Sequence, residues 1–147
     1  MQASPEDYRL TAIVMVVSVT VTLLIVGSVS ANSVDMADMP AVAWCAVIIF
    51  GIQWLAWIPA SILQSERFYD LTGGMTFMAA VIFSLWAGSQ SDAPSTRELL
   101  VSALAVIWSL RLSAFLFLRI HHSGKDGRFD RLKTSPIRFM VPWTLQA

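Results

Sequence analysis

Long stretches without a charged residue constrain this chain more than any other feature. Residues 10–34, 39–65 and 71–91 contain no Asp, Glu, Lys or Arg, and a further apolar stretch follows Glu98. A bilayer core about 30 Å thick needs about 20 helical residues, so each stretch can hold a membrane-spanning helix. Only 14% of the 147 residues are charged, against roughly 25% in an ordinary soluble domain. We therefore predict an integral membrane protein.

These stretches predict an all-α, polytopic membrane helix bundle with four transmembrane helices and the start of a fifth. The spans are expected at residues 10–29, 40–63, 71–88 and 99–118, followed by a basic segment at 119–138 and a partial helix at 139–147. No connector is long enough for a soluble domain, so residues 1–147 are expected to form one membrane domain. Nine final residues cannot cross a bilayer; they either lie along the interface or mark a truncated chain.

The first apolar stretch has a second interpretation, a cleaved signal peptide. Val29 and Ala31 have the small-residue spacing that a signal peptidase accepts. The leader is not basic, however, and the apolar run is longer than that of a usual signal peptide. A retained helix is favoured.

Basic residues are concentrated after the fourth predicted span. They are Arg119, Lys125, Arg128, Arg131, Lys133 and Arg138, whereas the connector at 30–39 has none. Cytoplasmic loops carry an excess of Lys and Arg, so this segment is expected at the cytoplasmic face of a bacterial inner membrane. Four crossings then place the N-terminus on the same face.

Composition and motifs argue against several classes of partner. The formal net charge is zero and no groove-reading motif occurs, so no nucleic acid partner is expected. The single cysteine, Cys45, has no disulfide partner within the chain. His121 and His122 lie near Asp126, but further ligands at suitable spacing are missing, so contact with lipid headgroups is preferred to a metal site.

Arg111 lies within the fourth predicted span, eight residues before Arg119. That is about 12 Å along a helix, deeper than the side chain can easily reach out of the lipid, so it is not expected to face acyl chains. It either lines a polar pocket and pairs with an anion, or bonds to Gln53 or another polar group of a neighbouring helix. Trp108 is one turn away and could stack on the guanidinium.

Glu66 and Asp70 are four residues apart, which on a helix places both carboxylates on one face. They could act in acid/base chemistry, but a solvated helix rim is favoured from the pattern alone. Gly73 and Gly74 permit close approach of a substrate or a helix, with helix packing preferred. Arg128 and Arg131 could bind phosphate, although the topology rule alone would also produce them.

Several of these residues together resemble a known family. The matching elements are Tyr69-Asp70-Leu71-Thr72-Gly73, Trp108-Ser109-Leu110-Arg111-Leu112, Arg119 followed by Gly124, Asp126, Arg128 and Phe129, and Gln146-Ala147. In this order they resemble the bacterial membrane family related to the C-terminal domain of steroid 5-alpha-reductase. The resemblance extends from about Gln53 to the end of the chain, where family members continue into further helices.

The resemblance implies an NADPH-dependent reductase that acts on a lipid or steroid-like enone in the membrane. It implies that Arg111, Arg119, Asp126 and Arg128 line the cofactor cavity. By the same resemblance Tyr69 and Asp70 lie at its edge. In the steroid enzymes a glutamine or glutamate and a tyrosine polarise the substrate carbonyl, and Gln53 and Tyr69 are weak matches to these two residues. The missing C-terminal half would supply most of the cofactor site, so this chain alone is expected to be inactive.

Two other functions stay open. The fold is similar to isoprenylcysteine methyltransferases, which implies an S-adenosylmethionine-dependent transferase acting on a lipid or prenyl thiol. Alternatively, the chain is a small non-catalytic membrane protein that forms a homo-oligomer or binds another subunit.

Overall fold

The computed structural model describes residues 4–124 and 126–147, so Lys125 of the predicted basic segment lies outside the described residues. The helices are α1 (Pro5–Val29), α2 (Ala41–Ile62), α3 (Tyr69–Gly88), α4 (Thr96–Ser123) and α5 (Pro136–Gln146), with 3-10 turns η1 (Ser30–Asn32) and η2 (Gly127–Phe129) and strands β1 (Asp35–Met36) and β2 (Met39–Pro40). The first four helices are long and apolar enough to cross a membrane. The predicted all-α bundle and its fifth helix are confirmed.

Helices α1 and α4 begin earlier than their apolar stretches because polar residues cap them. Ser4 and Asp7 form a capping box at the start of α1, and Ser95 and Glu98 form another at the start of α4. At the other end of α4, Gly124 takes φ 78°, a left-handed conformation that suits glycine. A prediction from charge-free stretches alone excludes these capped first turns.

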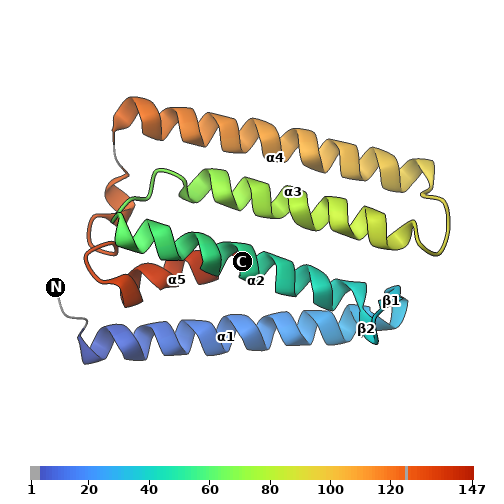
Figure 1. The fold of residues 1–147 in the computed structure, drawn as a ribbon, viewed down its shortest axis with the longest axis horizontal. Helices are drawn as coiled ribbons and strands as arrows, with labels where there is room; N and C mark the ends of the chain where they lie inside the picture. Colours follow the sequence, from blue (N-terminus) through green and yellow to red (C-terminus); the bar gives the residue numbers. More distant parts are fainter. Residues whose placement is uncertain (1–3, 125) are drawn as a thin grey trace.

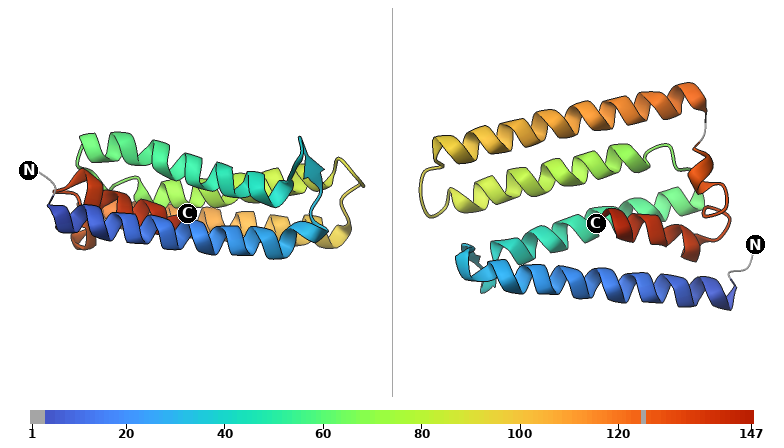
Figure 2. Two further views of the ribbon diagram at one scale, coloured as in Figure 1. Left: turned by 90° about the horizontal axis from the view of Figure 1, so that it is seen from below. Right: turned by 180° about the vertical axis from the view of Figure 1, so that it is seen from behind.

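The four long helices lie side by side in chain order, with α4 at one edge of the molecule (Figure 1). α5 packs against α1 and α2 and ends about halfway along the bundle (Figure 2). The alternative that the C-terminal residues lie along the interface is therefore wrong. We call the end that holds residues 63–68 and 126–135 the basic end, and the end that holds β1 and β2 the hairpin end.

A cluster of buried aromatic residues lies at the basic end. Phe129, Phe139 and Trp143 form its centre, and each is at most 3% exposed. The ring of Tyr69 packs on Phe129 and Trp143 with centroid separations of 4.8 and 5.1 Å. This aromatic contact joins η2, α3 and α5, so α5 organises the end of the bundle where the basic segment lies.

Hydrogen bonds fix α5 against its neighbours. Thr11 of α1 donates to the carbonyl of Ile137 at 2.9 Å. On the opposite side, the indole of Trp57 in α2 donates to the carbonyl of Pro136 at 3.1 Å. Because each bond satisfies a polar group that would otherwise face an apolar surrounding, α5 has a defined position between α1 and α2.

The connector between α1 and α2 contains a short hairpin with a two-residue turn. β1 and β2 pair antiparallel, and both turn residues, Ala37 and Asp38, have positive φ angles. Positive φ at both central positions is typical of the type I′ turn that closes short hairpins.

Candidate functional site

Four charged residues meet at the basic end, and we call them the ion cluster: Asp70, Asp126, Arg119 and Arg128. Asp126 accepts from Arg128 Nε at 2.8 Å and also binds its Nη2 atom, which makes a two-point contact. Arg119 Nη2 lies 3.9 Å from Asp126, and Arg128 Nη2 lies 3.7 Å from Asp70. The cluster therefore joins α3, α4 and η2.

Local backbone structure positions this cluster. Asp126 is the N-cap of η2, and its side chain accepts the backbone N–H of Arg128 at 3.0 Å. α4 ends at Gly124, which turns the chain so that η2 runs back toward the start of α3. The turn brings Arg128 beside Asp70, 58 positions earlier in the chain, and explains why the pairing is not evident from spacing.

Glu66 makes two further contacts with the segment between α4 and α5. The carboxylate of Glu66, a residue only 3% exposed, accepts the backbone N–H of Asp126 at 3.0 Å and Lys133 Nζ at 2.9 Å. Lys133 also lies 3.4 Å from Asp130. Glu66 thus ties the connector before α3 to the segment between α4 and α5.

The surroundings of Glu66, Lys133, Asp126 and Arg128 favour the charged forms of these four side chains. Burial alone would raise the pKa of Glu66, but hydrogen bonds from Lys133 and from the Asp126 backbone outweigh it, so the pKa is lowered. The same hydrogen bond raises the pKa of Lys133. The hydrogen bond from Arg128 lowers the pKa of Asp126, and that bond in turn raises the pKa of Arg128.

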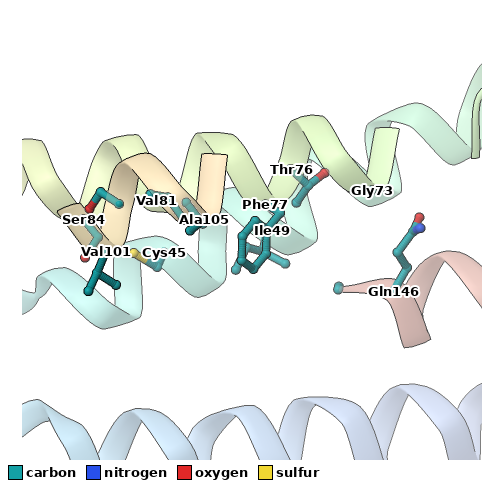
Figure 3. Close-up of a pocket in the computed structure, with 13 residues that line it drawn as sticks. Cys45, Ile49, Gly73, Thr76, Phe77, Val81, Ser84, Val101, Ala105 and Gln146 are labelled. Carbon is teal, nitrogen blue, oxygen red and sulfur yellow. The ribbon is translucent and has the colours of Figure 1, made fainter. Parts of the chain in front are cut away.

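Two adjoining hollows lie between the helices, and Asp70 of the ion cluster lines one of them. A cleft of about 190 Å³, which we call the polar cleft only because Asp70 and Gln146 line it, runs between α3 and α4. Most of its wall is apolar and includes Phe77, Trp108 and Leu112. The apolar cavity, about 440 Å³, lies between α2, α3 and α4 (Figure 3). Gly73, Phe77 and Gln146 line both hollows, so they adjoin one another.

The glycine pair of α3 is explained by close packing. A Cβ atom at Gly74 would lie 2.6 Å from the Cβ of Ser113, and Ser109 donates to the carbonyl of Gly74 at 3.0 Å. A Cβ atom at Gly73 would lie 2.7 Å from Cδ of Gln146, whose side chain points from the end of α5 toward α3 (Figure 3). The preferred interpretation, helix packing, is confirmed.

The structure does not bring Arg111 into the ion cluster. Its side chain is exposed on α4, and among the described residues no hydrogen bond or ion pair joins it. Trp108, 56% exposed, packs edge-on to Phe77 and not on Arg111. The expectation that this chain shields Arg111 is wrong, because α4 lies at the edge of the bundle. Its role in cofactor binding stays a prediction.

Gln53 and Tyr69 are both engaged inside the protein. Gln53 is fully buried and donates to Thr76 Oγ1 at 3.2 Å. The Tyr69 hydroxyl donates to the carbonyl of Pro142 at 2.9 Å. Neither residue lines the polar cleft or the apolar cavity. Their predicted role in polarising a substrate carbonyl stays a prediction.

The expectations for the charged residues at the basic end are partly wrong and partly confirmed. The solvated-rim interpretation of Glu66 and Asp70 is wrong, because their side chains are only 4% and 9% exposed. Arg119, Asp126 and Arg128 do come together, as expected. Sequence reasoning did not identify the contacts of Lys133 with Glu66 or of Gln146 with Gly73; no spacing signal indicates either one, since both join distant segments.

The site can offer charge to a polar ligand. Arg119 and Arg128 have side chains that are 47% and 60% exposed, so their guanidinium groups reach solvent at the basic end. Across the described ranges, no group of three or more His, Cys, Asp or Glu residues could hold a metal ion. Planar guanidinium donors suit phosphate and carboxylate oxygens.

Residues 56–147 match the family described as protein of unknown function (DUF1295). The matched region contains the ion cluster, both glycines of α3 and all of α5. No curated protein matches the chain, and no solved structure does.

Proposed function

The chain belongs to the DUF1295 family, and from that premise we propose that it forms part of a membrane-bound, NADPH-dependent reductase of lipid enones. One observation carries the proposal: a cluster with exposed arginines adjoins, through the polar cleft, a cavity inside the membrane-spanning part. A reductase of this kind must hold a polar, anionic cofactor next to an apolar substrate. The resemblance to the steroid 5-alpha-reductase family supports the same reaction class.

The donor chemistry of the ion cluster fits the phosphate groups of NADPH. Arg128 uses Nε and Nη2 for Asp126, which leaves Nη1 for another acceptor. Within the described ranges, the ion pair of Arg119 with Asp126 is long, at 3.9 Å, so Arg119 keeps donors for an anion. We assign Arg119 and Arg128 to phosphate binding and Asp126 to holding Arg128 in place. When bound, NADPH supplies the hydride.

The apolar cavity fits the lipid half of the reaction. Its volume, about 440 Å³, lies within the range of about 300–1,000 Å³ that is usual for ligand pockets. Ile49, Phe77 and Val81 contribute apolar walls from α2 and α3. Such walls bind an acyl or isoprenoid chain and exclude water from it.

The test is a titration of the purified chain, in lipid nanodiscs, with NADPH. Arg128→Gln should weaken binding roughly 10- to 100-fold, since a hydrogen bond to a charged group contributes about 1.5–3 kcal/mol. Arg97→Gln, in the first turn of α4 near the hairpin end, is the matched control and should bind as the wild type does. Equal binding by all three proteins would overturn the assignment.

A parallel titration with S-adenosylmethionine separates the related transferase. Binding of that ligand in place of NADPH would favour a lipid or prenyl-thiol methyltransferase. Binding of neither, together with a stable oligomer in mild detergent, would favour the non-catalytic alternative.

A further inference from the structure

The polar cleft contains a buried carboxylate oxygen that no hydrogen bond satisfies. The side chain of Asp70 is 9% exposed, and its Oδ2 atom has no hydrogen-bond partner among the described residues. Arg128 Nη2 lies 3.7 Å from this atom, which is an ion-pair distance and too long for a hydrogen bond. Buried acceptors of this kind are rare in native proteins, because an unsatisfied polar group costs free energy.

A second unsatisfied acceptor lines the same cleft. Oε1 of Gln146 is buried and lacks a hydrogen-bond partner within the described part of the chain. Gln146 extends from the end of α5 toward Gly73 of α3, so it lies at the junction of the polar cleft and the apolar cavity (Figure 3). The cleft thus presents two acceptors next to an apolar cavity.

We propose that the polar cleft binds the hydroxyl group of a lipid alcohol, which donates its hydrogen to Asp70, while the alcohol's chain occupies the apolar cavity. The proposal rests on the proposed function only in making this alcohol the substrate class of the reductase. The hydroxyl of such a substrate would lie at Asp70, and its apolar chain would extend away from Asp70 into the apolar cavity.

The chemistry of Asp70 favours a hydroxyl over head groups that have no hydrogen-bond donor. An ionised carboxylate only accepts hydrogen bonds, so an ether, ester or ketone oxygen finds no donor in Asp70. The ion cluster already balances two carboxylates with two guanidinium groups. An ammonium group would add an uncompensated positive charge near Arg128, whereas a hydroxyl adds a donor without adding charge.

The experiment measures displacement of tritium-labelled cetyl alcohol from the full chain in phosphatidylcholine nanodiscs, without any nicotinamide nucleotide. The competitors are unlabelled cetyl alcohol, its methyl ether, which has the same chain but no donor, and cetylamine. For the wild type we expect the alcohol to compete at roughly 10-fold lower concentration than either other compound. Equal competition by alcohol and ether would overturn the proposal.

Two variants test whether Asp70 causes the preference for the alcohol over the ether. Asp70→Asn places amide donors in the cleft and should reduce the preference for the alcohol over the ether to less than about 3-fold. Asp92→Asn, in the exposed connector between α3 and α4, is the control and should retain it. An unchanged preference in Asp70→Asn would also overturn the proposal. If that variant fails to fold, the wild-type comparison of alcohol with ether still decides.

This assay and the NADPH titration can fail separately. A preference for the alcohol without NADPH binding would leave the lipid site standing and reject the reductase. NADPH binding without a preference for the alcohol would support the reductase and reject the lipid-alcohol site.

Discussion

The two ends of the bundle are held together in different ways. At the basic end, α5 contributes Phe139 and Trp143 to a buried aromatic core, and hydrogen bonds join it to α1 and α2. At the hairpin end, α1 and α2 leave between them a groove of about 450 Å³ lined almost entirely by apolar side chains, among them Leu23 and Val47. Leu23 and Val47 are 65% and 53% exposed.

The difference follows from what each end must satisfy. Lipid solvates apolar side chains well, so exposed Leu and Val at the hairpin end need no protein partner within the membrane. Buried charges at the basic end do need partners, because removing a charge from water is costly. Each buried carboxylate there has a cationic neighbour, Lys133 for Glu66 and Arg128 for Asp70. Protein contacts in this bundle therefore accumulate where charge is buried.

The largest effect expected from this comparison is at Trp143. Trp143→Ala should lower the free energy of unfolding by about 3–5 kcal/mol, because it empties the centre of the aromatic core. Leu23→Ala at the hairpin end should change it by about 0.5 kcal/mol or less, since that side chain is exposed. Unfolding by denaturant in mild detergent measures both. Similar losses would show that the two ends are held alike.

Arg111 lies at the edge of the bundle, where a charge lacks the protein contacts of the basic end. Arg111→Leu should raise the free energy of unfolding in a bilayer by about 2.5–3.5 kcal/mol, because the exposed guanidinium no longer lies at acyl-chain depth. Reconstituted protein in vesicles, unfolded by denaturant, provides the measurement. A loss of stability would mean that Arg111 has a stabilising partner in the membrane.

Glu66 makes the basic end sensitive to pH. Glu66→Gln should cost about 1.5–3 kcal/mol, the contribution of hydrogen bonds to a charged group. In the wild type the pKa of Glu66 lies below its ordinary value of 4.5, so its contribution is fully present above pH 4.5 and is lost as the pH falls through the folded pKa. The pKa of Lys133 is raised above 10.5, so its contribution is complete below pH 10.5 and is lost as the pH rises further.

Thermal unfolding across this range measures the effect. The Glu66→Gln variant should show a shallower fall in stability below pH 4.5 than the wild type. Parallel pH profiles would remove Glu66 from the account.

The smallest effect expected is at the α3–α4 contact. Gly74→Ala should lower the free energy of unfolding by about 1 kcal/mol, because the added Cβ collides with Ser113 and this outweighs the gain in helix propensity. Gly51→Ala is the matched control, since a Cβ there meets nothing within 4 Å, and it should be neutral or stabilising. Identical results for both, from thermal unfolding, would contradict the close contact.

Much of the fold is predictable from the sequence because lipid imposes a simple rule. Stretches without charge give the four spans. They miss the capped first turns, as at Ser95 and Glu98, and the last turn of α4, which ends at Ser123. Arg119, Asp126 and Arg128 are close in sequence, and their meeting is predictable. Burial of Glu66 is not, because it depends on Lys133, 67 positions away, and on the turn after α4.

For Arg111, depth along the helix does not predict whether the side chain is buried or exposed. The distance from Arg119 along a helix indicates how deep a side chain lies, but not which face of the bundle it occupies. That depends on which helix lies at the edge, and here α4 does. Placement of α5 between α1 and α2 is likewise a tertiary result.

Hydrogen–deuterium exchange of the chain in nanodiscs, with and without saturating NADPH, tests most directly whether the basic end is the binding end. We expect slower exchange of backbone amides in residues 63–70 and 126–135, with residues 30–40 and 89–95 unchanged. No slowing at saturating NADPH, or slowing confined to the hairpin end, would contradict it.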